Sequence, residues 1–301
     1  MRVFLTGATG FIGSAVIPEL LNAGHQVLGL TRSDEGAAAL TAAGAEVHRG
    51  SLEDLDSLKR GAAAADGIIH LAFIHDFSKY TDNCETDRRA IEAMGSVLEG
   101  TTKPFVITSG TAIVGAGKKI TEYDVAAADS KTIPRLASEE AAAAVAARGV
   151  NVSLVRLPPS VHGEGEHGFI PILINIAREK GVSVYVGEGN NRWPAVHRFD
   201  AARLFRLALE SGAAEPRYHA IGDEGIPVRQ IAEVIGRHLN IPVASKSPEE
   251  AMQHFGWLGG FMALDIPASA KLTEQRLQWQ PTHPGLIEDM EVGHYFLSEQ
   301  D

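Results

Sequence analysis

The sequence of 301 residues contains one cysteine, Cys84, and no apolar run long enough to span a bilayer. A single cysteine excludes an internal disulfide and any metal site built only of cysteines. Basic residues are also in the minority, since 27 Lys and Arg oppose 38 Asp and Glu and the net charge is −11. This balance disfavours general nucleic-acid binding and attachment to an anionic membrane surface. The first residues enter a predicted strand without a signal-peptide pattern, so we expect a cytoplasmic protein.

Three glycines follow the first apolar segment of the chain, Val3 to Leu5, and a helical pattern begins directly after them. In dinucleotide-binding proteins the first such glycine permits a tight turn, the second lets the backbone approach a pyrophosphate, and the third lets the helix pack closely on the strand. The helix N-terminus then offers free N–H groups to the phosphates. The stretch therefore predicts a dinucleotide site, with contacts from Gly7, Thr9, Gly10, Phe11, Ile12 and Gly13.

Short apolar segments alternate with helical patterns up to residue 157, and this alternation breaks down afterwards. The first part predicts a Rossmann fold, a doubly wound parallel sheet with helices on both faces. We expect a nucleotide-binding domain over residues 1–157. A smaller, mainly substrate-binding lobe is expected over residues 158–301, with some segments returning to the first domain. Later helical patterns cover Cys84 to Leu98, Pro134 to Arg148, Val228 to Leu239 and Ser247 to Phe255.

Arg32 and Ser33 follow the second predicted strand, where an NAD site usually places a carboxylate on the ribose 2′-hydroxyl. A guanidinium beside a hydroxyl suits a 2′-phosphate instead, so we predict NADP(H), with NAD(H) as the alternative cofactor. A solvated loop charge is the other interpretation of Arg32. Ligands bind beyond the carboxyl ends of parallel strands, which makes the ends of further strands cofactor candidates: Ser51, Leu52, Leu71, Ala72, Phe73 and Thr108. His70, at the end of the fourth strand, is interpreted as structural.

Three separated stretches resemble one family, the extended short-chain dehydrogenases/reductases. Thr6 to Gly13 resembles the family's TGxxGxxG, Trp193 to Asp200 is similar to its later Trp-x-x-Val-His segment, and Leu154 to Gly163 resembles its strand and proline loop beside the nicotinamide. The last resemblance implies cofactor contacts from Leu157, Pro158, Pro159 and Val161. The family also implies a Rossmann fold and an NAD(P)-dependent activity. It allows a homodimer, which is usual among its members.

The active-site positions of that family are altered here. Where the family has Tyr-x-x-x-Lys this chain has Lys131-x-x-x-Arg135, which is similar to an atypical subgroup with His-x-x-x-Arg. The resemblance implies that Arg135 also holds the nicotinamide ribose. Arg135 stays protonated and can orient or stabilise charge, whereas Lys131 could act as an acid if its pKa fell. A solvated loop lysine is the other interpretation of Lys131.

The family's catalytic hydroxyl aligns with Gly110, between Ser109 and Thr111. We take both neighbours as candidates for touching a substrate carbonyl, although hydroxyls that only cap a turn are common. Other candidate proton donors lie later in the chain: His162, His167, His197 and Arg198. They show no metal-ligand spacing, and we expect no metal site. Phe169 and Trp193 are assigned either to an apolar pocket or to the core.

These observations favour an NADPH-dependent oxidoreductase that reduces a small carbonyl compound, a ketone, an aldehyde or an imine. Hydride transfer needs mainly positioning, so an altered acid need not abolish it. A nucleotide-sugar epimerase or dehydratase is the first alternative, and the missing tyrosine counts against it. A catalytically inactive NADP(H)-binding sensor is the second alternative, and the altered active-site positions support it. Fold alone does not choose among the three.

Overall fold

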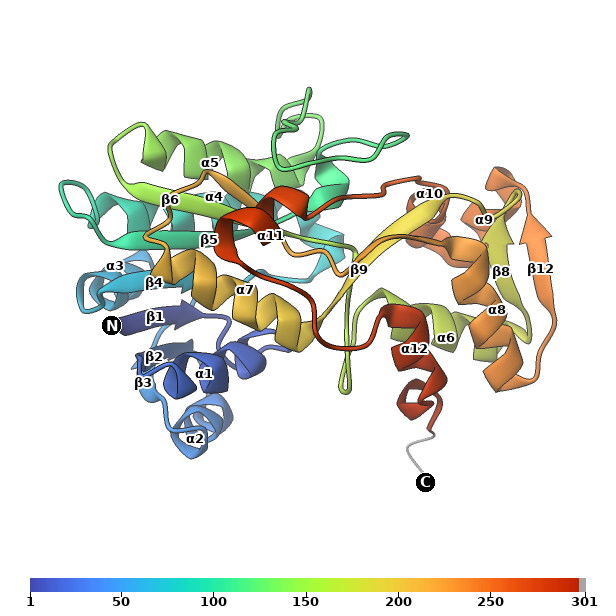
Figure 1. Ribbon diagram of the computed structural model, residues 1–301, viewed down its shortest axis with the longest axis horizontal. Helices are drawn as coiled ribbons and strands as arrows, with labels where there is room; N and C mark the ends of the chain where they lie inside the picture. The colour runs from blue at the N-terminus through green and yellow to red at the C-terminus, as the bar shows by residue number, and fades with distance from the viewer. Residues whose placement is uncertain (298–301) are drawn as a thin grey trace.

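The computed structural model describes residues 1–297 and consists of a large helix-covered sheet and a smaller lobe (Figure 1). The large sheet has seven parallel strands in the order β10-β6-β5-β4-β1-β2-β3. These strands are β1 (Arg2–Thr6), β2 (Gln26–Thr31), β3 (Glu46–Arg49), β4 (Gly67–His70), β5 (Pro104–Gly110), β6 (Asn151–Leu157) and β10 (Arg217–His219). The order of strands reverses between β1 and β4, which is where this architecture binds ligands. The predicted doubly wound fold is confirmed.

Helices cover both faces of the large sheet, as Figure 1 shows. One face carries α1 (Gly13–Asn22), α2 (Asp34–Ala42) and α7 (Arg198–Glu210), whose apolar side chains share one buried cluster with β1. The other face carries α3 (Leu55–Ala63), α4 (Tyr80–Ser96) and α5 (Ala137–Ala146), which form a second cluster. Successive side chains of a strand point to opposite faces, and β1 shows this directly. Val3 and Leu5 belong to the first cluster and Phe4 to the second.

The smaller lobe is built from the second half of the chain and has a core of its own. A three-stranded sheet of order β11-β9-β7 and a parallel pair β12-β8 form its strands. They are β7 (Ser160–His162), β8 (Ser183–Val186), β9 (Arg192–His197), β11 (Asp223–Pro227) and β12 (Val243–Lys246). Its helices are α6 (Phe169–Lys180), α8 (Val228–Leu239), α9 (Pro248–Phe255), α10 (Gly259–Met262) and α12 (Leu286–Glu291). In contrast, α7, β10 and α11 (Lys271–Leu277) pack with the large sheet.

Short 3₁₀ turns lie between or after several of these elements: η1 (Phe77–Lys79), η2 (Thr111–Ile113), η3 (Pro134–Leu136), η4 (Gly256–Leu258) and η5 (His294–Phe296). Capping residues explain where α9 begins and where α8 ends. Ser247 and Glu250 form a reciprocal capping box at the start of α9. Asn240, in the left-handed conformation, ends α8. Helix α8 matches its predicted bounds, and α9 begins one residue after the predicted start.

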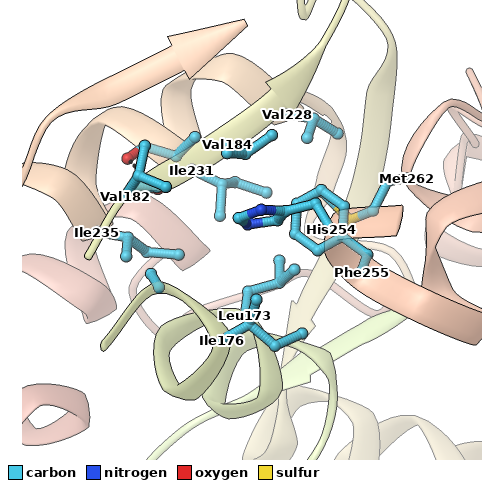
Figure 2. A pocket seen from close by; sticks show the side chains of 13 residues that line it. Leu173, Ile176, Val182, Val184, Val228, Ile231, Ile235, His254, Phe255 and Met262 are labelled. Carbon is cyan, nitrogen blue, oxygen red and sulfur yellow. Dashed lines mark hydrogen bonds between the residues drawn. The ribbon is translucent and has the colours of Figure 1, made fainter. Parts of the chain in front are cut away.

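A small cavity lies inside the smaller lobe, between α6, α8, β8 and α9 (Figure 2). Its volume is about 10 Å³, which is at the lower limit for one water molecule. The His254 ring points into this cavity among apolar side chains such as Leu173 and Ile231 (Figure 2). Burial lowers the pKa of His254, with Lys180 and Lys246 adding to the effect. The cavity is too small to be a substrate site, so the chemistry must lie elsewhere.

None of the helices within residues 1–297 combines the length and apolar character needed to cross a membrane. The same residues contain no group of three His, Cys, Asp or Glu side chains arranged to hold a metal ion.

Candidate functional site

The glycine turn joins β1 to α1 and leaves the helix N-terminus open. Gly7 has a φ of +67°, and a Cβ there would lie 2.8 Å from the backbone nitrogen of Ala72. A Cβ on Gly13 would overlap the carbonyl oxygen of Gly7. Helix α1 has no side-chain cap and no acidic residue in its first turn, so its first N–H groups can bind an anion. The turn therefore fits a dinucleotide pyrophosphate. The other predicted contacts in the turn are exposed or half-buried: Thr9, Gly10, Phe11 and Ile12.

The end of β2 presents a cation to the predicted ribose site. Arg32 is exposed, and within residues 1–297 it forms no ion pair. The hydroxyl of Ser33 caps α2 by accepting a hydrogen bond from the N–H of Gly36 at 3.0 Å. The nearest carboxylate in the sequence, Asp34, is paired with Arg49. This arrangement leaves a guanidinium rather than a carboxylate beside the ribose position.

The two predicted adenine contacts at the end of β3, Ser51 and Leu52, differ in how deeply they are buried. Ser51 is half-buried, and its hydroxyl accepts a hydrogen bond from the N–H of Glu53 at 3.3 Å. The side chain of Leu52 is only 8% exposed and packs in the core cluster that includes Leu30 and Leu58. The Leu52 side chain thus contributes to the core beneath this edge of the sheet.

The segment after β4 runs beside the glycine turn. The N–H of Leu71 donates to the carbonyl oxygen of Thr6 at 3.3 Å, and the N–H of Ala72 donates to the Thr6 hydroxyl at 3.2 Å. Phe73 follows and is half-buried. The structure therefore brings three predicted cofactor contacts to the point where strand order reverses.

A buried chain of polar side chains crosses the sheet from Thr6 to Arg135. The Thr6 hydroxyl lies 2.7 Å from Nδ1 of His70, and Nε2 of His70 lies 2.9 Å from Oδ1 of Asp87. The other carboxylate oxygen of Asp87 accepts from Nη1 of Arg135 at 3.1 Å and from the Ser138 hydroxyl. Burial alone would raise the pKa of Asp87, but Arg135 and His70 outweigh it and hold that pKa below its usual value. Asp87 is therefore a buried anion that fixes two other side chains.

This network holds the Arg135 guanidinium at the carboxyl end of β5. Nη2 of Arg135 donates to the carbonyl oxygen of Thr108 at 3.3 Å, and the guanidinium carbon lies 4.4 Å from the centroid of the Phe73 ring. The Arg135 side chain is 14% exposed. The structure thus brings together Arg135, Thr108 and Phe73, all of which the sequence predicted as cofactor contacts. A fixed cation there can bind ribose or stabilise negative charge, but it cannot act as a proton donor.

Sequence reasoning did not find Asp87, although a signal was present. Cys84, Asp87, Ile91 and Met94 are spaced by three or four residues and are all buried on α4. A carboxylate on an apolar helical face needs a partner, because an unpaired buried charge is very costly. His75 was also missed. It follows Phe73, and burial together with Arg135 and His167 lowers its pKa.

The two candidate hydroxyls at the end of β5 have different surroundings. The Ser109 hydroxyl donates to Oε1 of Glu139 at 2.6 Å, and Glu139 is bound by Nε and Nη2 of Arg156 at 2.8 and 2.7 Å. This cluster favours a structural role for Ser109. In contrast, Oγ of Thr111 is buried and has no hydrogen-bond partner among residues 1–297. A buried orphan hydroxyl costs free energy unless a ligand satisfies it, so Thr111 is the better candidate for contacting a carbonyl.

Lys131 lies in the loop before η3 and is exposed. Its backbone N–H donates to the carboxylate of Asp129 at 3.2 Å, which fixes the local turn. The helix predicted from Pro134 starts as the 3₁₀ turn η3 and becomes α-helical at Ala137. Lys131 and Arg135 are therefore not one helical turn apart on a single α-helix, and the catalytic role of Lys131 stays a prediction.

The proline loop connects β6 to β7 at the junction of the two sheets. Of its predicted cofactor contacts, Pro158 is buried and the other three are half-buried: Leu157, Pro159 and Val161. Strand β7 pairs with β9 in parallel, which leads the chain into the smaller lobe. The loop thus lies on the boundary between the two parts of the molecule.

Two of the histidines that we considered as proton donors, His162 and His197, are held in contacts with other side chains. Nδ1 of His162 lies 2.8 Å from Oδ2 of Asp289, and the ring is fully buried. His197 stacks on His283 with ring centroids 4.7 Å apart. Burial, together with His162 and His283, lowers the pKa of His197 to about 4. His197 is therefore neutral at pH 7, which makes it a poor candidate for the proton donor.

The loop after β7 lies against the glycine turn. The His167 ring contacts the Phe11 ring edge-on at 5.8 Å, and the Arg198 guanidinium carbon lies 4.7 Å from the Phe11 centroid. In the same loop, Glu166 accepts from the Tyr295 hydroxyl at 2.7 Å, and burial raises the pKa of Glu166 to about 7. The loop of the smaller lobe and the first residue of α7, Arg198, thus both reach the predicted pyrophosphate site.

Two curated relatives match nearly the whole chain, and a more distant one matches about three quarters of it. An uncharacterized protein of Schizosaccharomyces pombe is 52% identical over 296 residues, which cover 98% of this chain and 100% of the relative. An uncharacterized protein of Saccharomyces cerevisiae is 48% identical, with 98% and 99% covered. A 4-hydroxy-2-methyl-3-oxo-4-farnesyl-3,4-dihydroquinoline-1-oxide ketoreductase of Stigmatella aurantiaca is 28% identical, with 76% and 70% covered.

The fold has many solved counterparts. The dTDP-glucose 4,6-dehydratase DesIV of Streptomyces venezuelae, solved with NAD, superposes with a TM-score of 0.78 at 20% identity, with 98% of this chain and 96% of that chain covered. The model of the NAD dependent epimerase/dehydratase family matches residues 3–222. The chain therefore belongs to the NAD-dependent epimerase/dehydratase family of NAD(P)-dependent enzymes, the extended short-chain dehydrogenases/reductases.

Proposed function

We propose that this protein is an NADPH-dependent reductase of carbonyl compounds. The observation that carries the proposal is the guanidinium of Arg135, which Asp87 holds over Phe73 at the strand-order reversal. The family places its lysine on the nicotinamide ribose there, and Arg135 supplies a permanent charge at the corresponding position. Two relatives with reductase names support the reaction class, the ketoreductase of Stigmatella aurantiaca and a 2-alkyl-3-oxoalkanoate reductase of Stenotrophomonas maltophilia.

NADPH would supply the hydride, and the glycine turn, Arg32 and Arg135 would hold it. The carbonyl carbon gains the hydride, the π-electron pair moves to oxygen, and this oxygen takes up one proton, which gives an alcohol and NADP⁺. The chain's task is to position the carbonyl and to stabilise the charge that develops on its oxygen. The orphan hydroxyl of Thr111 can donate a hydrogen bond to that oxygen. Lys131 or solvent completes the protonation.

An epimerase or dehydratase starts by oxidising its substrate and therefore needs a base. Tyr123, between β5 and α5, is 67% exposed and packs under Arg276, 5.5 Å from its guanidinium carbon. This placement gives Tyr123 no support as the missing base. The sensor alternative predicts NADPH binding without turnover, and the experiments below distinguish it from the reductase.

The Thr111→Val variant tests the proposed chemistry. Valine keeps the shape but removes the hydroxyl, so we expect kcat/KM for NADPH-dependent carbonyl reduction to fall about 100-fold. Thermal stability should stay the same or rise, because an unpaired buried hydroxyl is removed.

The Lys131→Ala variant tests which group donates the proton to the carbonyl oxygen. Lost turnover with retained NADPH binding identifies Lys131 as the donor, whereas retained turnover leaves His162, His197 or water as the donor. A parent protein that binds NADPH but reduces no aldehyde, ketone or imine would contradict the proposed function.

The cofactor preference is tested at Arg32. We expect Arg32→Ala to raise the Kd for NADPH about 10- to 100-fold, because charge-assisted hydrogen bonds to a phosphate contribute about 1.5–3 kcal/mol. The Kd for NADH should change little, since NADH lacks the 2′-phosphate. Fluorescence titration with both cofactors measures the two values. Equal losses for NADPH and NADH would show that Arg32 does not bind the 2′-phosphate.

A further inference from the structure

Six aromatic side chains form a continuous wall between the two parts of the molecule. We call them the aromatic wall: Phe73, Phe77, Tyr80, Phe169, Trp257 and Phe261. The first three lie between β4 and the start of α4, and the others lie on α6, η4 and α10 of the smaller lobe. The two groups meet where Phe77 stacks on Trp257, with centroids 4.9 Å apart and an interplanar angle of 19°. Figure 1 shows α4 and α10 in different parts of the molecule.

The middle of this wall is open to solvent. Phe77 is 47% exposed and Trp257 is 58% exposed, whereas the other two tryptophans, Trp193 and Trp279, are fully buried. Trp193 packs edge-on against Phe261 at 5.0 Å, so it supports the wall from within the core. Large exposed apolar surfaces on a folded protein often mark a binding site. The exposed pair of Phe77 and Trp257, which joins the two lobes, is therefore a candidate ligand-binding surface.

One end of the wall reaches the proposed reaction site. Arg135 lies over Phe73, and the Phe73 ring is 6.3 Å from Tyr80, which stacks on Phe77 at 5.7 Å. His75 is edge-on to Phe73 at 5.3 Å, and burial and the Arg135 charge lower its pKa. A molecule lying on this wall would thus place one end beside Arg135 and extend outwards along aromatic rings.

The charges around the wall do not favour a diphosphate. One acidic and one basic residue, Asp76 and Lys79, flank the exposed Phe77 and balance each other. A nucleotide sugar carries two phosphate charges that need cations. An uncharged planar group matches the wall better, because aromatic rings pack on one another in offset or edge-on geometry.

We propose that the aromatic wall binds the ring of the substrate, so that the substrates are aryl aldehydes and aryl ketones, with the carbonyl next to or near an aromatic ring. This inference rests on the proposed reductase function. It assigns Phe77 and Trp257 as the residues that determine specificity, while Arg135 and Thr111 act at the carbonyl end.

The kinetic test compares benzaldehyde with propanal at saturating NADPH. We expect kcat/KM to be about tenfold higher for benzaldehyde, a ratio that corresponds to about 1.4 kcal/mol and lies within the range for one aromatic pair. Trp257→Ala and Phe77→Ala should raise KM for benzaldehyde about tenfold with little effect on propanal. Tyr123→Ala, an exposed aromatic outside the wall, is the matched control and should change neither value. Equal efficiencies for both aldehydes in the parent protein would overturn the inference but leave the reductase function standing.

A binding test is independent of turnover. Among the three tryptophans only Trp257 is exposed, so its emission should shift to shorter wavelength as benzyl alcohol displaces water from the wall. The shift should saturate with benzyl alcohol, be absent with 1-propanol, and disappear in Trp257→Phe. A saturable shift in a protein that reduces no carbonyl would contradict the reductase function and support the wall as an aromatic site. No shift in the parent protein would overturn the wall as a binding site.

Discussion

Replacing Gly10 by valine should weaken NADPH binding by at least about 100-fold while the protein still folds. Gly10 is exposed in the glycine turn, and its N–H donates to the carbonyl oxygen of Gly7 at 3.0 Å. A Cβ at this position would lie 3.2 Å from that oxygen and otherwise face open space. The side chain would occupy the approach to the helix N-terminus, where we expect the pyrophosphate to bind. Losing two charge-assisted hydrogen bonds of about 1.5–3 kcal/mol each gives this magnitude.

The Gly13→Ala variant is the comparison for Gly10→Val, because we expect it to lose stability as well as cofactor binding. A Cβ there would overlap the carbonyl oxygen of Gly7 and crowd the backbone of Ala8, neither of which can move without disturbing β1 or α1. We expect both a lower melting temperature and lost binding. Calorimetric titration with NADPH and thermal unfolding separate the two effects. Unchanged NADPH affinity in Gly10→Val would contradict the position of the cofactor site.

The sheet could be predicted from the sequence because its signals are local. Val3, Phe4 and Leu5 form a continuous apolar run, as expected for a parallel strand buried on both faces. The glycines that follow mark the turn with a spacing that few other structures require. Helix bounds were less well predicted where caps are weak. Helix α4 begins at Tyr80 rather than at Cys84, and Lys79 at its start provides no side-chain cap.

The site was predictable only in part, because its partners are distant in sequence. Arg135 could be placed by alignment, but its anchor Asp87 is 48 residues away, and their contact depends on how α4 packs beside η3. Phe77 and Trp257 are further apart still, and neither has a local pattern that indicates the other. Phe169 and Trp193 were assigned either to a pocket or to the core. The structure places Trp193 in the core and Phe169 within the aromatic wall.

The Asp87→Ala variant is expected to lose both stability and activity. Removing the carboxylate leaves Nε2 of His70 and the guanidinium of Arg135 without their buried partner. Breaking such a buried pair costs about 3–5 kcal/mol, which corresponds to roughly 10 °C in melting temperature for a chain of this size. NADPH turnover should fall as well, because Arg135 is no longer fixed over Phe73. Glu85→Ala is the control on the same helix, since the Glu85–Arg88 pair is half-buried, Arg88 keeps Glu140 as a second partner, and we expect a loss below about 1 kcal/mol.

The pH dependence of the stability loss in Asp87→Ala tests whether the charge of Asp87 causes it. The folded-state pKa of Asp87 is lowered, so its contribution to stability is present above the unfolded pKa of about 4 and is lost as the pH falls through the folded value. The difference in melting temperature between the parent and Asp87→Ala should therefore be large at pH 7 and should shrink in acid. Asp87→Asn, which keeps an acceptor oxygen but no charge, should lie between the two proteins at pH 7. A difference that does not change between pH 7 and pH 3 would mean that lost packing, rather than the lost anion, destabilises the variant.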